Sequence, residues 1–62
     1  MNKIVRILMN RDGMTESEAK SLYKEVKAEI NSAVAAGDYN LAEEIMAADL
    51  GLEMDYIFEI IF

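Results

Sequence analysis

The sequence predicts an all-α protein: a small bundle of three main helices plus a short C-terminal helix, forming one domain over residues 1–62. Proline is absent and glycine occurs only three times, which leaves few turns for a strand-rich fold. Hydrophobic residues make up 53% of the chain, so it is too apolar to remain disordered. The three glycines divide the chain into four segments, and each carries apolar residues suited to a helix.

The first segment, residues 3–11, has a helical spacing of apolar residues. The positions i, i+3 and i+4 of this stripe are Ile4, Ile7 and Leu8. β-Branched residues also suit a strand, which stays open as the alternative over residues 3–9. Gly13 follows the segment, where a left-handed glycine can close the last carbonyl groups of a helix. We therefore expect a first helix that ends just before Gly13.

The second segment, residues 16–36, is predicted to be the longest helix. Thr15 can cap it, and Glu18 can return a bond to the backbone of Thr15, which completes a capping box. No helix breaker occurs before Gly37. The apolar arc that this helix must bury consists of Ala19, Leu22, Tyr23, Val26, Ile30, Ala33 and Val34. Against it we expect to find Ile4, Ile7, Leu8, Leu41, Ile45 and the C-terminal aromatic residues.

The third segment, residues 39–50, is predicted to be a helix bounded by two suitable end residues. Asp38 can serve as its N-cap, and Gly51 can serve as its stop. The apolar positions that form one narrow face are Leu41, Ile45 and Ala48. We expect this face to pack against the longest helix.

The fourth segment, residues 52–62, is apolar on nearly every side of a helix, because eight of its eleven residues are apolar. One small bundle has little area with which to cover it, since so short a chain buries only about 60% of the surface that its unfolded form exposes. We therefore predict a homo-oligomer. Its interface is assigned to the last apolar residues: Ile57, Phe58, Ile60, Ile61 and Phe62.

Charge is divided unevenly along the chain, whose net charge is −6. All six Lys and Arg residues lie within residues 1–27, which carry a balance of +2, and the remainder carries eight acidic residues and no base. A large acidic field favours docking on a basic protein surface and disfavours nucleic-acid binding. We assign the docking to acidic residues of the second half: Glu43, Glu44, Asp49, Glu53 and Asp55.

A small anionic ligand, such as a nucleotide, is the alternative partner. In a symmetric oligomer, a few basic side chains beside an aromatic ring can converge around one axis and sequester such a ligand. The residues assigned to this role are Arg6, Arg11, Lys20, Tyr23 and Lys24. A purely structural oligomerisation module is the third alternative.

Catalysis is disfavoured by the residue inventory. With no Cys and no His, the chain lacks disulfides, the usual zinc ligands and the base that activates a serine nucleophile. Adjacent carboxylates such as Glu43 and Glu44 need a cleft that separates their environments, and a chain this small has little interior. We expect a non-enzymatic protein without a cofactor or a metal. Without a membrane-spanning run or an export signal, we also expect it to be soluble and cytoplasmic.

Several short motifs lie around the three glycines. They are Arg11-Asp12-Gly13-Met14-Thr15, Glu18-Ala19, Gly37-Asp38-Tyr39 with Ala42-Glu43-Glu44, and Leu50-Gly51-Leu52-Glu53-Met54-Asp55-Tyr56-Ile57-Phe58-Glu59. Together they resemble the motifs of short helical proteins from phages and prophages of gut and Gram-positive bacteria. Where the related pattern often has Pro, this chain has Met54. The resemblance implies a viral accessory protein that interferes with host defence in the cytoplasm of a bacterial host cell.

Overall fold

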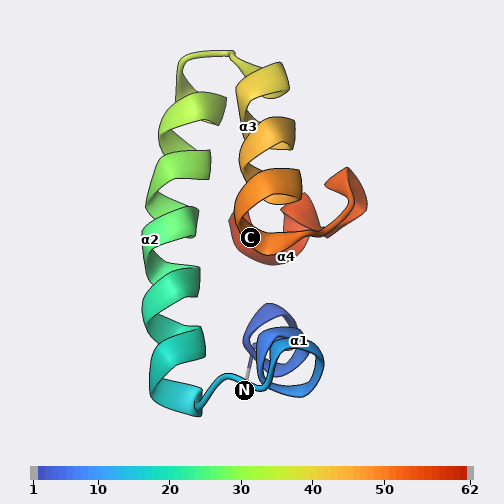
Figure 1. Cartoon of the computed structure of the whole chain (residues 1–62). Helices are drawn as coiled ribbons and strands as arrows, with labels where there is room; N and C mark the ends of the chain where they lie inside the picture. Colours follow the sequence, from blue (N-terminus) through green and yellow to red (C-terminus); the bar gives the residue numbers. More distant parts are fainter. Residues whose placement is uncertain (1, 62) are drawn as a thin grey trace.

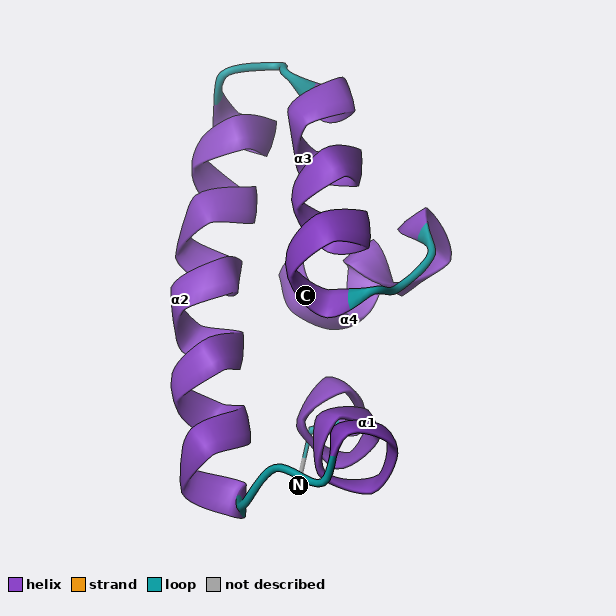
Figure 2. Cartoon of the chain, viewed as in Figure 1, coloured by secondary structure: helices purple, strands orange, loops and turns teal. Residues whose placement is uncertain are grey.

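The structure is a computed structural model that describes residues 2–61. Its elements in chain order are α1 (Lys3–Asp12), α2 (Glu16–Ala35), α3 (Tyr39–Ile45), the π-helical turn η1 (Met46–Leu50), the 3₁₀ turn η2 (Met54–Tyr56) and α4 (Ile57–Ile61). Figure 1 shows α3 antiparallel beside α2, with α1 across the other end of α2. No strand occurs within residues 2–61, which confirms the all-α prediction (Figure 2).

α1 begins after Asn2, whose side chain caps the helix. Its Oδ1 atom accepts hydrogen bonds from the backbone N–H groups of Ile4 at 2.7 Å and Val5 at 3.4 Å. Gly13 closes the other end with a left-handed φ of 68°. The predicted helix is confirmed, and the strand alternative over residues 3–9 is wrong. Caps at both ends and a buried stripe stabilise the helix despite its β-branched residues.

α2 has the capping box that the sequence predicts. The backbone N–H of Glu18 donates to Oγ1 of Thr15 at 3.1 Å, and the N–H of Thr15 donates to Oε1 of Glu18 at 2.9 Å. The pKa of the Glu18 carboxyl is lowered, chiefly because the backbone N–H of Thr15 stabilises its charged form. At the other end the helix stops at Ala35, and Gly37 turns the chain with a φ of 76°.

The core lies between α2 and the elements packed against it. The predicted arc of α2 faces this core: Ala19, Val26, Ile30 and Ala33 are buried, and Leu22, Tyr23 and Val34 are half-buried. In α1, Ile4 and Leu8 are buried as predicted. Val5 is buried although it was not predicted, and Ile7 is only half-buried. The remaining core residues come from the second half of the chain: Ala42, Met46, Leu50, Ile57 and Ile60.

The segment of α3 and η1 turns a different face to the core from the one predicted. Leu41 is 42% exposed, and Ala48 is exposed as well. The buried side chains are instead Ala42, Met46 and Leu50. Ala42, Met46 and Leu50 lie at positions i, i+4 and i+8, so they also share one face of the segment. The segment therefore has two neighbouring apolar stripes, and packing against the rest of the chain, which a helical wheel does not include, buries the second one.

The C-terminal segment folds back so that α4 lies against both α1 and α2. Ile57 is 7% exposed and Ile60 is fully buried, so the single chain covers both side chains. Neither offers surface to a second copy, which corrects their assignment to an oligomer interface. Phe58, expected to pack against α2, is 63% exposed. Phe62 and the side chain of Ile61 lie outside the described part of the chain.

Candidate binding surface

The carboxylates assigned to partner docking are all exposed, on α3, η1, η2 and the turn before η2. We name them the acidic surface: Glu43, Glu44, Asp49, Glu53 and Asp55. Two shallow pockets of about 420 and 440 Å³ share Glu43 and Ala47 in their walls, so the pockets adjoin. Glu44 lines the smaller pocket and Glu53 lines the larger. The fold therefore brings three of the five carboxylates together around one open surface.

Asp55, like Glu53, shares a pocket with a basic residue. It lines a third pocket, of about 240 Å³, together with Lys3, Glu53, Tyr56 and Glu59. The Lys3 ammonium nitrogen lies 5.6 Å from the centre of the Tyr56 ring, within reach of a cation–π interaction. The charge of Lys3 offsets part of the acidic field there. Asp49 lines none of these three pockets.

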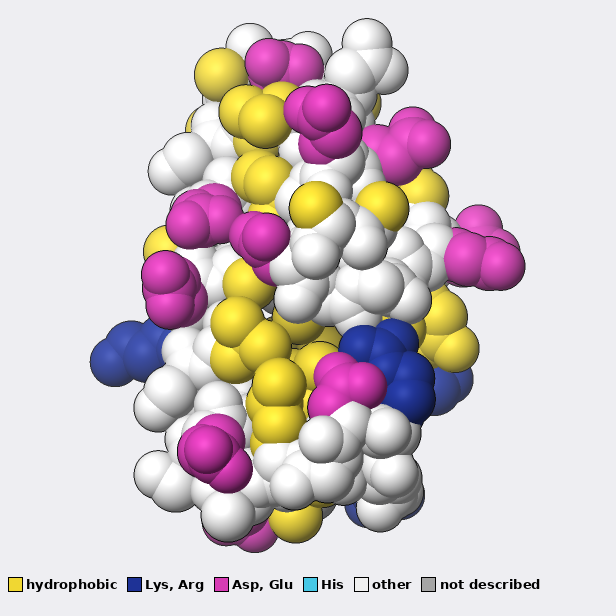
Figure 3. Space-filling view, viewed as in Figure 1, with side chains coloured by type: hydrophobic (Ala, Val, Ile, Leu, Met, Phe, Trp, Pro, Cys, Tyr) yellow, Lys and Arg dark blue, Asp and Glu magenta, His cyan; other side chains and the backbone are white. Residues whose placement is uncertain are grey.

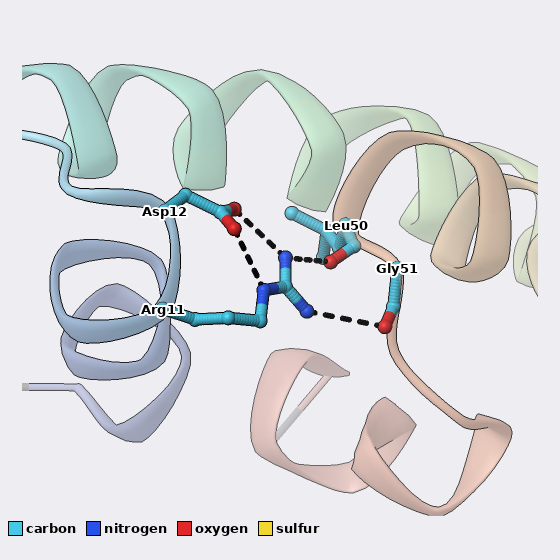
Figure 4. Close-up of polar contacts among 4 residues, drawn as sticks. All are labelled: Arg11, Asp12, Leu50 and Gly51. Atoms are coloured by element: carbon cyan, nitrogen blue, oxygen red, sulfur yellow. Dashed lines mark hydrogen bonds and ion pairs between the residues drawn. The ribbon is translucent and has the colours of Figure 1, made fainter.

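Arg11, assigned to an anionic ligand, is engaged within the chain (Figure 4). Its Nε and Nη2 atoms each donate to the carboxylate of Asp12 at 2.8 Å. Nη2 also donates to the carbonyl of Leu50 at 2.6 Å, and Nη1 donates to the carbonyl of Gly51 at 3.2 Å. The pKa of Asp12 is lowered, chiefly because its hydrogen bonds with the Arg11 guanidinium stabilise the carboxylate. Arg11 thus caps the end of η1 and links it to α1.

Tyr23 and Lys20 also have partners within the chain. The Tyr23 hydroxyl accepts a hydrogen bond from Nδ2 of Asn2 at 3.1 Å and donates one to the backbone carbonyl of Glu59 at 3.3 Å. It therefore ties α2 to the start of α1 and to α4. Lys20 forms an ion pair with Glu16 at 3.1 Å on the exposed side of α2.

Arg6 and Lys24, the other two residues of the predicted anion-binding set, lie on different helices. Arg6 lines an open pocket of about 490 Å³ on α1, together with Lys3, Ile7, Asn10 and Arg11. No residue of α2 lines this pocket. The single chain therefore does not bring the five residues into a common pocket. A pocket assembled from them in an oligomer stays a prediction.

The sequence does not predict a groove that the structure shows between α2 and α3. This α2–α3 groove has a volume of about 510 Å³ and is lined by Glu29, Ser32, Ala33, Ala36, Asp38, Leu41 and Ile45. Figure 3 shows apolar side chains along the seam between the two helices, with acidic side chains on both sides. The stripe of Leu41 and Ile45 was the available signal, but the prediction assigned both residues to the core.

Comparison with protein-family models, with curated proteins and with solved structures gives no match to this chain. Among residues 2–61, no helix is both long enough and apolar enough to cross a membrane. In the same part of the chain, no three carboxylates are grouped so that they can hold a metal ion.

Proposed function

We propose that the protein is a non-enzymatic binding protein that docks on a basic patch of another protein through its acidic surface. The observation that carries this proposal is the grouping of Glu43, Glu44 and Glu53 around two adjoining pockets. This group lies in the part of the chain that has no Lys or Arg. An acidic field steers a basic partner into place and raises its rate of association.

The acidic surface is available to a partner. In the described part of the chain, ion pairs join Arg11 with Asp12 and Lys20 with Glu16, all within α1 and α2. Neither carboxylate of α3, Glu43 or Glu44, forms such an ion pair. Leu52 and other apolar residues lie between the carboxylates of the larger pocket, and they can supply the apolar contacts that the centre of an interface needs.

The setting that we propose is a phage accessory protein that blocks a host-defence protein. This setting rests on the resemblance of the motifs around Gly13, Gly37 and Gly51 to those of short phage and prophage proteins. A small helical body with an acidic face can occupy a basic groove that its target uses for another negatively charged partner. Such a role needs binding alone and no chemical step.

Sequestration of a small anion is the alternative function. It is supported by the pocket on α1, where Lys3 and Arg6 are exposed beside Arg11. It is weakened by the partners that Arg11, Tyr23 and Lys20 already have, because an anion must compete with those contacts.

Single charge reversals on the full chain test the proposal. A protein captured from host cells is purified, and its affinity is measured for the wild type, Glu43→Lys and the control Glu25→Lys, which changes the same charge on exposed α2. We expect Glu43→Lys to weaken binding about tenfold or more and Glu25→Lys to stay within about threefold. Equal effects would contradict docking through the acidic surface.

Native mass spectrometry tests the alternative. Protein purified from cells is inspected for a retained ligand of nucleotide size, with Arg6→Glu as the comparison. We expect no such ligand. A ligand that the wild type retains and Arg6→Glu loses would overturn our preference for a protein partner.

A further inference from the structure

The α2–α3 groove combines an apolar lining with open access. Its lining includes Ala33 of α2 and the C-cap residue Ala36, together with Leu41 and Ile45 of α3. Leu41 is 42% exposed, and Ile45 is half-buried. Small residues on one wall and larger aliphatic residues on the other leave room for an inserted side chain. Covering this lining removes apolar surface from water, which favours association.

The dimensions of the groove suit a short stretch of helix. The residues that α2 and its C-cap contribute are Glu29, Ser32, Ala33 and Ala36. They occupy positions i, i+3, i+4 and i+7, so the wall runs for two helical turns, or roughly 10 Å at the α-helical rise. A partner helix laid in such a groove inserts apolar anchors at the same spacing. The groove can therefore hold two apolar side chains of a partner helix that lie one turn apart.

The charges at the rim of the groove favour a positively charged partner. Glu29 of α2 and Asp38 at the start of α3 both line the groove. Oδ1 of Asp38 accepts the N–H of Leu41 at 3.1 Å, and a carboxylate has capacity for further bonds. No Lys or Arg follows Lys27 in the chain, and Figure 3 shows no basic side chain around the upper part of the seam. Each wall of the groove therefore carries a carboxylate that can pair with a cation of the partner.

A second copy of this chain does not supply a matching helix. Among the described helices, α1 alone carries more basic than acidic residues. The pocket on its outer side is lined by Lys3, Arg6, Ile7, Asn10 and Arg11, in which Ile7 is the one apolar side chain. Ile7 is itself half-buried. α1 thus offers cations without the pair of apolar anchors that the groove can seat.

We infer that the α2–α3 groove binds a basic amphipathic helix of the partner protein. The apolar side chains of that helix lie against Leu41 and Ile45, and its Lys or Arg side chains pair with Glu29 and Asp38. This inference rests on the proposed function, because it names the segment of the basic partner that the protein recognises. It adds a contact site on the side of α3 that carries Leu41, beside the acidic surface.

A model peptide tests the groove with the full-length chain. The probe is a fluorescein-labelled peptide of Leu and Lys, about 14 residues or roughly four turns long, with Leu at positions i, i+3, i+4 and i+7. A second peptide has the same composition in an order that gives no apolar face. Fluorescence anisotropy measures the affinity of both. We expect the amphipathic peptide to bind about tenfold or more tightly than the reordered one.

Matched variants locate the contact. Leu41→Gln removes the apolar wall and Glu29→Lys reverses the rim, and each should weaken binding about tenfold or more. Glu44→Lys is measured as well and reports any contribution of the acidic surface. The controls are Tyr39→Gln, a 60% exposed side chain of α3 outside the groove, and Glu25→Lys, the same charge change at an exposed position of α2 outside both surfaces. Both controls should stay within about threefold. Circular dichroism checks that each variant keeps its helices.

Each other outcome overturns the inference in a distinguishable way. If Glu44→Lys weakens binding and Glu29→Lys does not, the acidic surface alone docks the peptide, so the proposed function stands without the groove. Equal binding of the two peptides also excludes the groove. If neither charge reversal alters binding, both the inference and the proposed function fail. If Leu41→Gln instead dissociates a dimer of the protein, a second copy occupies the groove.

Discussion

At the scale of single residues, Arg11 has a role that its local sequence does not predict. Its guanidinium bonds to Asp12, the next residue, and to the carbonyl of Leu50, which lies 39 residues further along the chain. The last carbonyl groups of a helix lack partners within it, and a cation there also interacts favourably with the helix dipole. Because the contact depends on the tertiary fold, spacing along the chain suggested a ligand-binding arginine instead.

We predict that Arg11→Lys lowers the thermal unfolding midpoint. A lysine keeps the positive charge but lacks the planar fork that reaches Asp12 and two carbonyls at once. The control is Arg6→Lys, which changes an exposed arginine of the same helix. Thermal denaturation followed by circular dichroism measures both variants. Equal midpoints for the two would contradict a capping role for Arg11.

The capping box of α2 predicts a dependence of stability on pH. The pKa of Glu18 is lowered from 4.5 in the folded chain, so the unfolded chain binds a proton at higher pH than the folded chain does. The stabilisation is therefore complete above the ordinary pKa and is lost as the pH falls through the folded-state pKa. Glu18→Gln keeps an oxygen acceptor for the N–H of Thr15 but does not titrate.

We expect the difference in unfolding free energy between wild type and Glu18→Gln to shrink on acidification from about pH 6 to about pH 3. Urea denaturation at several pH values measures this difference. A constant difference over the range, or one that grows as the pH falls, would show that the capping carboxylate does not gain its charge-dependent stabilisation in the folded state.

At the scale of elements, the sequence predicts helices well where their ends are capped locally. The cap by Thr15, the cap by Asp38 and the stop at Gly51 are all confirmed, because each depends on residues within a few positions of the helix end. The buried face after residue 39 is predicted wrongly, because the segment has two apolar stripes and tertiary packing decides that Ala42, Met46 and Leu50 are the buried one. The fold of α4 onto α1 and α2 also depends on contacts far apart in sequence.

We predict that Gly51→Ala and Gly37→Ala destabilise the chain by similar amounts. Both glycines have left-handed φ values, 63° and 76°, so Ala at either site costs about 1–2 kcal/mol of backbone strain. A Cβ atom at position 37 meets open space, and one at position 51 lies 3.4 Å from Nη1 of Arg11, which is an ordinary van der Waals distance. Chemical denaturation of both variants measures the costs.

A clearly larger cost at Gly51 than at Gly37 would contradict this prediction. It would show that the Arg11 guanidinium, which donates to the carbonyl of Gly51, does not accommodate the added methyl group.

We predict that the C-terminal helix contributes to the core of the single chain. Ile60→Ala should lower the unfolding free energy by about 2–5 kcal/mol, because the side chain is fully buried. Phe58→Ala, on the same helix, should cost clearly less, since Phe58 is 63% exposed. Chemical denaturation measures both. A larger loss for Phe58→Ala than for Ile60→Ala would contradict the described packing of α4.

At the scale of the whole molecule, composition predicts the class of fold and the separation of charge. The exposure of Glu43 and Glu44 follows from their charge, so that part of the candidate site could be predicted. The grouping of Glu53 with them could not, because it depends on the turn after η1. The α2–α3 groove was missed for a related reason, since it exists only because Leu41 faces outward.

Among the residues assigned to the interface of the predicted homo-oligomer, Ile57 and Ile60 are buried in the single chain, whereas Phe58 is exposed. Tyr39, Leu41 and Phe58 are the large hydrophobic side chains exposed within the described part of the chain. A chain of 62 residues has a small core, so covering such side chains adds stability that the monomer lacks. Deleting the last residues is a poor test, because Ile60 belongs to the core of the monomer. Phe58→Glu changes an exposed position instead.

We therefore expect sedimentation equilibrium at micromolar concentrations to give a mass above 7.0 kDa for the wild type and the monomer mass for Phe58→Glu. The thermal midpoint of the wild type should rise with protein concentration, because association stabilises the folded chain by mass action. The control is Ser21→Glu, which introduces the same charge at an exposed position of α2 and should keep the oligomer. A monomer mass for the wild type, with a midpoint independent of concentration, would show that the single chain is stable alone and that Phe58 is simply a surface residue.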